Sequence, residues 1–201
     1  MTGQIADEVR HTGVDYQVVA VAGTGLFDPA DHGLTPEPLS TACWRGFHCG
    51  YVIKADRLLL DEVTIGLPAE QRKTVLFGRS SKTGRGAHRS APTYRKLAAP
   101  MPFTGRLLLG DEYVRVAHLH MGFLPAWSYV QVVELTFDGG LLAATRDRSA
   151  EAARVRELIG AELARPGAGE RIEDWVHRTF SLDFGYSLPD SGEERGRADG
   201  V

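Results

Sequence analysis

Residues that favour strands come first in this chain, and residues with helical spacing come last. From residue 14 to residue 147 the sequence is rich in β-branched, aromatic and leucine residues, interrupted by Gly, Asp and Pro. Apolar residues at helical spacing appear only after residue 148. Because this segregated order is typical of α+β folds, we predict an antiparallel, twisted β-sheet or partial barrel over residues 14–147. Helices over residues 149–165 and 170–180 are predicted to cover one side of it.

The first part of the predicted sheet contains one strand, one long loop and one hairpin. The run VDYQVVAVA at residues 14–22 predicts a strand, and residues 23–40 concentrate Gly, Pro and Asp, which predicts a long loop. Residues 44–54 and 58–65 predict two strands joined by a turn at residues 55–57. This turn lacks the Asp-Gly pair that tight hairpins favour.

Two later segments resemble this hairpin. Residues 103–114 and 132–145 again place a turn-forming sequence beside consecutive leucines, and Asp138-Gly139 is the strongest hairpin signal in the chain. The three units predict a meander of hairpins. They arise either from an internal repeat or from the chemistry that unrelated hairpins share.

The C-terminal region is predicted to contain two helices and a polar tail. Ala152, Val155, Ile159 and Leu163 form an apolar stripe at helical spacing, and Ser149 precedes them as a capping residue. The last residues have almost nothing to bury. We therefore predict one domain over residues 1–184 and a disordered tail over residues 185–201.

The composition is that of an ordinary globular protein. Of 201 residues, 43% are hydrophobic and 24% are charged, and the formal net charge is −3. The apolar run at residues 18–22 is far shorter than the roughly 20 residues that span a bilayer, and the charged opening does not resemble a secretory signal. We therefore expect no membrane segment and a cytoplasmic location.

Cys43 and Cys49 are six residues apart, so on one extended strand they are too distant for a disulfide, and we expect two buried free thiols.

Several short motifs resemble a group of small uncharacterised bacterial proteins. The runs CWRGF, DRLLLDEV, PFTGRLLLG, HMGF and WSYVQVVELTFDGG carry the resemblance, over roughly residues 42–148. They combine a Trp-Arg-Gly-aromatic strand with Leu-x-Leu hairpins. The resemblance implies a β-rich core and no particular activity.

Positive charge is concentrated in one part of the chain. Between residues 71 and 110 there are no acidic residues and nine basic ones, although the whole chain carries 26 acidic and 23 basic residues. The basic residues within segment 72–96 are Arg72, Lys73, Arg79, Lys82, Arg85, Arg89, Arg95 and Lys96. This pattern suits an acidic protein surface, a nucleic acid or a phosphorylated ligand, with Tyr94 available for stacking. The alternative is a solvated loop that balances the acidic remainder of the chain.

A second candidate site involves two histidines. His118 and His120 are two residues apart, so on a strand both imidazoles would face the same side, as a metal pair requires. A third ligand would come from His48, Cys43, Cys49 or Glu134, and the metal would be Zn²⁺ or Fe²⁺. The alternative is a pair of structural histidines that hydrogen-bond to neighbouring groups.

No complete catalytic motif is present. The chain lacks both a Gly-x-Ser-x-Gly elbow and a His-Glu-x-x-His helix. Arg45 lies between aromatic residues, and we expect it to pair with Asp61 or Glu62 on the return strand. We therefore predict a non-enzymatic binding protein that needs no cofactor and docks an anionic partner through residues 72–96. The alternative is a metal-dependent or small-molecule enzyme with its site around His118 and His120.

Overall fold

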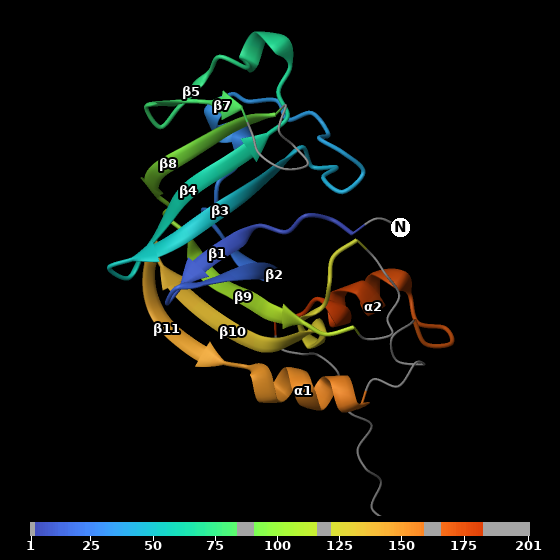
Figure 1. Ribbon diagram of the computed structural model, residues 1–201. Coiled ribbons are helices and arrows are strands. Elements are labelled where there is room, and N and C mark those ends of the chain that lie inside the picture. Colours follow the sequence, from blue (N-terminus) through green and yellow to red (C-terminus); the bar gives the residue numbers. More distant parts are fainter. Residues whose placement is uncertain (1–2, 84–90, 116–121, 159–165, 183–201) are drawn as a thin grey trace, which may run out of the picture.

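A closed β-barrel is the central feature of the fold. The computed structural model describes residues 3–83, 91–115, 122–158 and 166–182. Within these residues nine strands form one sheet, in the order β11-β10-β9-β2-β1-β3-β4-β8-β7. A further pairing between Leu141 and Arg57 joins β11 to β4 and closes seven of these strands into a barrel (Figure 1). The structure therefore confirms a β-rich fold with helices, although the barrel is closed and not partial.

The elements follow one another along the chain with short connections in most places. The strands of the sheet are β1 (Glu8–His11), β2 (Val14–Thr24), β3 (Phe47–Lys54), β4 (Arg57–Ile65), β7 (Lys82–Thr83), β8 (Pro92–Pro100), β9 (Thr104–Tyr113), β10 (Tyr129–Asp138) and β11 (Leu141–Asp147). A separate small hairpin is formed by β5 (Val75–Leu76) and β6 (Arg79–Ser80), and the helices are α1 (Ser149–Leu158) and α2 (Ile172–Thr179).

The strand directions correct the prediction of a purely antiparallel sheet. Strands β1 and β3 run parallel, whereas the other pairs of the sheet are antiparallel. The reason is that β1 and β2 form a tight hairpin, so β2 ends at the end of the barrel where β1 begins. The long segment 25–46 then crosses this same end. Strand β3 therefore starts on the same side as β1. The prediction also omitted β1, because it placed the start of the sheet at residue 14.

The hairpin predictions are confirmed at two of three places. Strands β3 and β4 are joined by Ala55 and Asp56, and β10 and β11 by Gly139 and Gly140, all with positive φ as two-residue hairpin turns require. The predicted hairpin over residues 103–114 is wrong, because this segment forms the single strand β9. Both edges of β9 find partners, β2 on one side and β10 on the other, which favours an extended chain over a turn.

Apolar side chains fill the interior of the barrel. The core includes Leu58, Leu60, Val63, Tyr94, Phe103, Leu107, Leu109, Leu135 and Phe137. Leu108, between two core residues of β9, points outward and is equally buried, because Trp127 and the α1 residues Ala152 and Val155 cover it. Charged side chains that can meet a ligand therefore lie on the outer wall and at the barrel ends.

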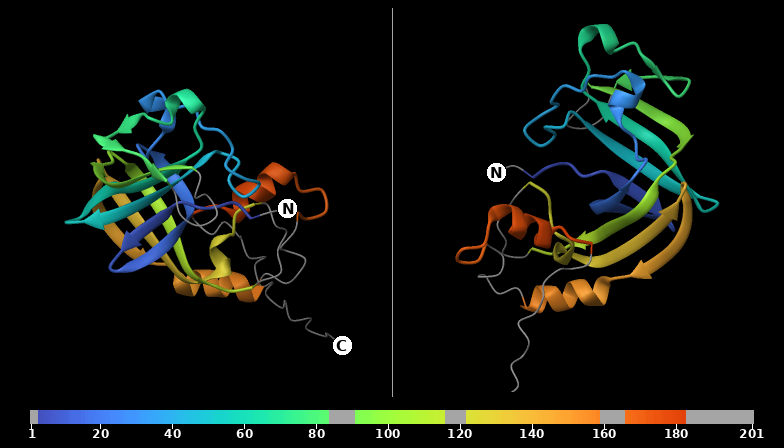
Figure 2. Two further views of the ribbon diagram at one scale, coloured as in Figure 1. Left: turned by 45° about the horizontal axis from the view of Figure 1, so that its top comes forward. Right: turned by 180° about the vertical axis from the view of Figure 1, so that it is seen from behind.

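One end of the barrel is closed by two segments that we call the cap, residues 25–41 and 66–83. The cap buries Leu34, Leu67 and Leu76 against the core, and Thr35 N–H donates to the Gln71 side chain over 2.9 Å. Figures 1 and 2 place the cap at the end of the molecule opposite α1 and α2. The predicted long loop thus forms a large part of the cap.

The predicted helices are observed where the structure describes them. Helix α1 spans Ser149–Leu158, and the rest of its predicted range, residues 159–165, lies outside the described residues. Helix α2 spans Ile172–Thr179, close to the predicted 170–180. The predicted tail also lies outside the described residues. Among the described helices, none combines the length and the apolar composition that crossing a membrane requires.

Candidate functional site

A strained hairpin turn stands at the edge of the cap. Strands β5 and β6 pair Leu76 with Arg79, so Phe77 and Gly78 form a two-residue turn with φ values of 46° and 72°. Such turns favour Asn or Gly at the first position, because a left-handed backbone is unfavourable for a bulky side chain. Phe77 is therefore a costly choice for the backbone of this turn.

The Phe77 ring belongs to an aromatic cluster that is open to solvent. Its centroid lies 4.8 Å from that of the exposed His32 ring, which in turn stacks on the buried Phe27 at 5.2 Å and 19° between planes. Phe77 itself is 39% exposed. The cluster therefore presents the Phe77 and His32 rings at the surface and anchors them on a core residue.

Four of the predicted basic residues lie on the cap, and we call them the cap cations: Arg72, Lys73, Arg79 and Lys82. All four are exposed. Arg72 Nε donates to the Leu67 carbonyl over 3.1 Å, and Ser81 Oγ, next to Lys82, donates to the Arg72 carbonyl over 3.2 Å. Within the described part of the chain, none of the four forms an ion pair with a carboxylate.

The remaining predicted basic residues are placed differently. Arg95 is half-buried on β8, and its Nε donates to Glu62 Oε2 over 2.7 Å, so its charge is already balanced. Lys96 is exposed on the same strand. Arg85 and Arg89 lie outside the described residues. The structure therefore brings half of the predicted set together on the cap.

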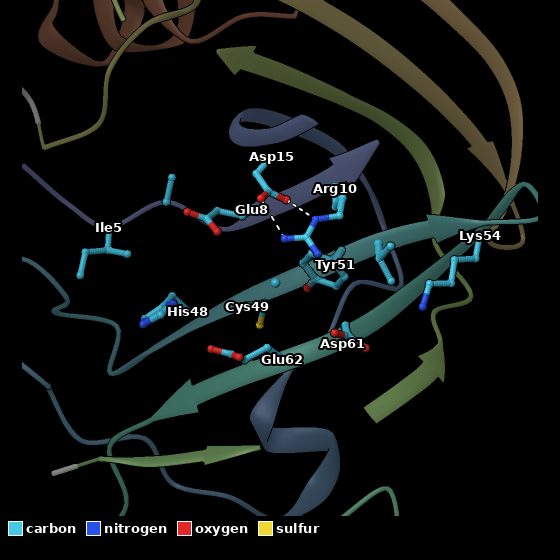
Figure 3. A pocket seen from close by; sticks show the side chains of 13 residues that line it. Ile5, Glu8, Arg10, Asp15, His48, Cys49, Tyr51, Lys54, Asp61 and Glu62 are labelled. Atoms are coloured by element: carbon cyan, nitrogen blue, oxygen red, sulfur yellow. Dashed lines mark hydrogen bonds and ion pairs between the residues drawn. The ribbon is translucent and has the colours of Figure 1, made fainter. Parts of the chain in front are cut away.

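A pocket of about 380 Å³ lies on the outer wall of the barrel, over β1, β3 and β4 (Figure 3). In Figure 3 Glu8 of β1 and Glu62 of β4 come from strands on either side of β3, while His48 and Lys54 lie toward opposite ends. The lining residues are Ile5, Ala6, Glu8, Arg10, Asp15, His48, Cys49, Gly50, Tyr51, Val52, Lys54, Asp61 and Glu62. The pocket is therefore polar, with side chains of both charges.

The charged groups of this pocket are partly paired. Arg10 donates from Nε and Nη2 to both carboxylate oxygens of Asp15, over 2.6 and 2.9 Å, and Glu62 is held by Arg95. Desolvation, together with the nearby charges of Asp15 and Glu62, raises the pKa of the Glu8 carboxyl above its ordinary value. Unlike Asp15 and Glu62, Glu8 forms no ion pair within the described residues.

The metal hypothesis concerns residues that the structure places only in part. His48 lies on the outer face of β3 and lines the pocket, whereas His118 and His120 lie outside the described residues. Across residues 3–83, 91–115, 122–158 and 166–182, no group of three or more His, Cys, Asp or Glu side chains is arranged to hold a metal ion. The histidine site therefore stays a prediction.

Arg45 does not pair with Asp61 or Glu62, and that prediction is wrong. Its guanidinium binds both carboxylate oxygens of Asp7, one of them through Nη1 over 3.1 Å. Asp7 Oδ1 also accepts the Cys49 backbone N–H over 2.6 Å. The parallel pairing of β1 with β3 brings the residue before β1 beside the start of β3, which the sequence pattern did not indicate.

Both cysteines are free and buried, as predicted. Burial raises the pKa of the Cys43 thiol and raises that of Cys49 well above its ordinary value. Because the thiolate is the reactive form, we expect neither thiol of the native protein to react rapidly with dithionitrobenzoate at pH 8, and both to react after unfolding in urea. Absorbance of the released thionitrobenzoate measures this. Rapid reaction of a native thiol would contradict the described burial.

The chain was compared with protein family models, with curated proteins and with solved structures, and none of these comparisons finds a match. The resemblance to small bacterial proteins accordingly stays a prediction.

Sequence reasoning missed the aromatic cluster and the pocket. The signal for the first is the pair Phe77-Gly78 between two short strands, since Gly at the second position marks the turn and Phe is then out of place at the first. The signal for the second is Gly50 within the run FHCGYVIK, an isolated glycine in a strand.

Proposed function

We propose that this protein is a non-enzymatic binding protein and that its cap binds single-stranded nucleic acid. In this proposal the cap cations hold the phosphate backbone, and the rings of Phe77 and His32 stack on bases. Positively charged surfaces with interspersed aromatic rings are the usual means of binding single strands without sequence preference.

The observation that carries the proposal is the conformation of Phe77. Phe77 has a left-handed backbone conformation, in which Asn would be a more favourable residue. Its ring is 39% exposed, so the core does not fully account for its presence. A ligand that stacks on the exposed ring gives this residue a function.

The aromatic rings favour a single strand over the other anionic partners. A duplex offers phosphates and groove edges but keeps its bases stacked on one another, whereas a single strand leaves base faces free. An acidic protein would use the cap cations and would gain little from the His32 and Phe77 ring faces. We therefore place single-stranded nucleic acid first among anionic partners.

Replacing Phe77 by Asn is expected to weaken binding and to leave folding nearly intact. Loss of one base-stacking contact, worth about 1–3 kcal/mol, corresponds to a fall in affinity of about five- to 150-fold. The Asn-Gly turn that results suits the backbone and offsets the lost ring contacts. Fluorescence anisotropy with labelled oligodeoxythymidine of about 15 nucleotides, near the upper site size of small single-strand-binding barrels, measures the affinity.

Val75→Thr is the matched control, because Val75 is also apolar and exposed on this hairpin but carries no ring. Its affinity should stay close to that of the unmodified protein. Equal affinities of the Phe77→Asn variant and the unmodified protein would contradict base stacking on the Phe77 ring. Binding to polyglutamate in place of the oligonucleotide would identify an acidic protein partner and contradict the proposal.

A further inference from the structure

Gly50 occupies a position in which glycine is an unfavourable residue. It lies inside β3, where a residue without a side chain weakens the strand and packs against nothing. On the outer face it is flanked by Glu8 of β1 and Glu62 of β4, which are its direct register partners. Gly50 thus forms the floor of the pocket between two carboxylates.

Neither the backbone nor the packing requires glycine there. The φ angle of Gly50 is not positive, and an added Cβ would meet only the Cβ of Glu62, at an ordinary contact distance of 3.5 Å. The bulge beside it lies in β4, where Asp61 is the extra residue, so β3 carries no irregularity of its own. What the missing side chain does provide is the open volume of the pocket. An isolated glycine in a strand marks a bulge, a bend or the close approach of a ligand or another backbone, and over Gly50 the open pocket favours a ligand.

The charges of the pocket indicate what occupies it. Its lining contains four carboxylates and two basic side chains, and the Asp15 carboxylate is already bound by Arg10. At the floor the flanking groups are both carboxylates: Glu62 is bound by Arg95 through Oε2, and Glu8 has no ion pair within the described residues. A group seated over Gly50 therefore meets hydrogen-bond acceptors with negative charge on both sides.

We propose that the pocket over Gly50 binds a small amine or guanidinium compound, with Glu8 and Glu62 accepting hydrogen bonds from its cationic group. The volume of about 380 Å³ lies in the lower part of the range of small-molecule sites. This site is separate from the cap and does not depend on nucleic-acid binding.

The environment of Glu8 gives the binding a direction with pH. The groups that face it are Asp7 and Arg10 on its own segment, Asp15 on β2, and His48 and Glu62 across the pocket. Desolvation makes the largest contribution to the raised pKa of Glu8, the negative charges of Asp15, Glu62 and Asp7 raise it further, and the positive charge of Arg10 lowers it in part. Because only the ionised carboxylate attracts a cation, affinity falls as the pH is lowered through this raised pKa, and a bound cation moves the pKa of Glu8 back down.

The test uses L-argininamide, a small dication, and the ¹⁵N chemical shifts of backbone amides. We expect saturable shifts centred on Gly50 and Glu62, no such shifts with the anion N-acetylglutamate, and weaker binding toward acidic pH. Gly50→Leu fills the pocket and should weaken binding about tenfold or more, whereas Gly50→Ala, which has room for its Cβ, should weaken it less. Thermal unfolding is expected to give equal or higher midpoints for both variants, because side chains replace a glycine in a strand.

Glu8→Gln provides a second test that does not alter the pocket floor, and it should both weaken binding and remove most of its pH dependence. Absence of saturable shifts with L-argininamide would overturn the proposal. Equal affinity in Gly50→Leu and the unmodified protein, or a preference for N-acetylglutamate, would overturn it as well. None of these results bears on the cap, which is tested with oligonucleotides.

Discussion

Replacing Arg148 by Met is expected to lower the free energy of unfolding by about 3–5 kcal/mol, the usual loss when one member of a buried ion pair is removed. Arg148 is 5% exposed and Glu134 is 8% exposed, and they are in contact through Arg148 Nη1 and Glu134 Oε2 at 2.5 Å. Arg148 also donates to Glu151 of α1 over 2.6 Å and to the Leu182 carbonyl beyond α2 over 3.2 Å. One guanidinium therefore connects the barrel to both helical segments.

The size of this loss depends on the carboxylate that is left behind. Without Arg148, the Glu134 carboxylate keeps only the more distant Arg106 among the ion pairs of the described residues, at 3.8 Å. The double variant Arg148→Met, Glu134→Leu removes both buried charges and should recover much of the lost stability. Urea unfolding followed by tryptophan fluorescence measures all three proteins. A loss below about 1 kcal/mol in Arg148→Met would contradict the buried network.

The elements of this fold were predictable because their signals are local. The strand at residues 14–22, the hairpin that became β3 and β4, and the helical stripe after residue 149 all depend on neighbours a few positions away. The parallel pairing of β1 with β3, and the closure of the barrel by Leu141 and Arg57, join residues far apart in sequence. Short-range periodicity contains no information about such contacts, so the partner of Arg45 was predicted wrongly for the same reason.

For the candidate sites too, some features could be predicted from the sequence and others required the structure. The acid-free run gave the cap cations directly, since charge is a property of single residues. For Phe77 and Gly50 the sequence contains only weak signals, the pair Phe77-Gly78 and an isolated glycine in a strand, and the φ angle and the strand register are needed to show that each residue is unfavourable at its position. In both cases the structure identifies a residue that is unfavourable for its local conformation and leaves its functional purpose to be tested.

Replacing the four cap cations together by Gln is expected to remove most of the affinity for oligodeoxythymidine and to change stability little, because all four are exposed and lack carboxylate partners within the described chain. The matched control replaces four exposed cations away from the cap, Lys54, Arg57, Arg115 and Arg154, by Gln. Both variants lose the same amount of positive charge. Only the cap variant should lose binding, because the phosphates are held at the cap and not by the overall charge.

The salt dependence of this binding tests the central claim most directly. Each phosphate contact with a single strand contributes about 0.7 to the slope of log affinity against log salt concentration, so four contacts contribute about 2.8. Between about 50 and 200 mM salt, the unmodified protein and the matched control should therefore lose about 50-fold more affinity than the cap variant loses. Equal slopes for the unmodified protein and the cap variant, measured by fluorescence anisotropy, would contradict the assignment of nucleic-acid binding to the cap.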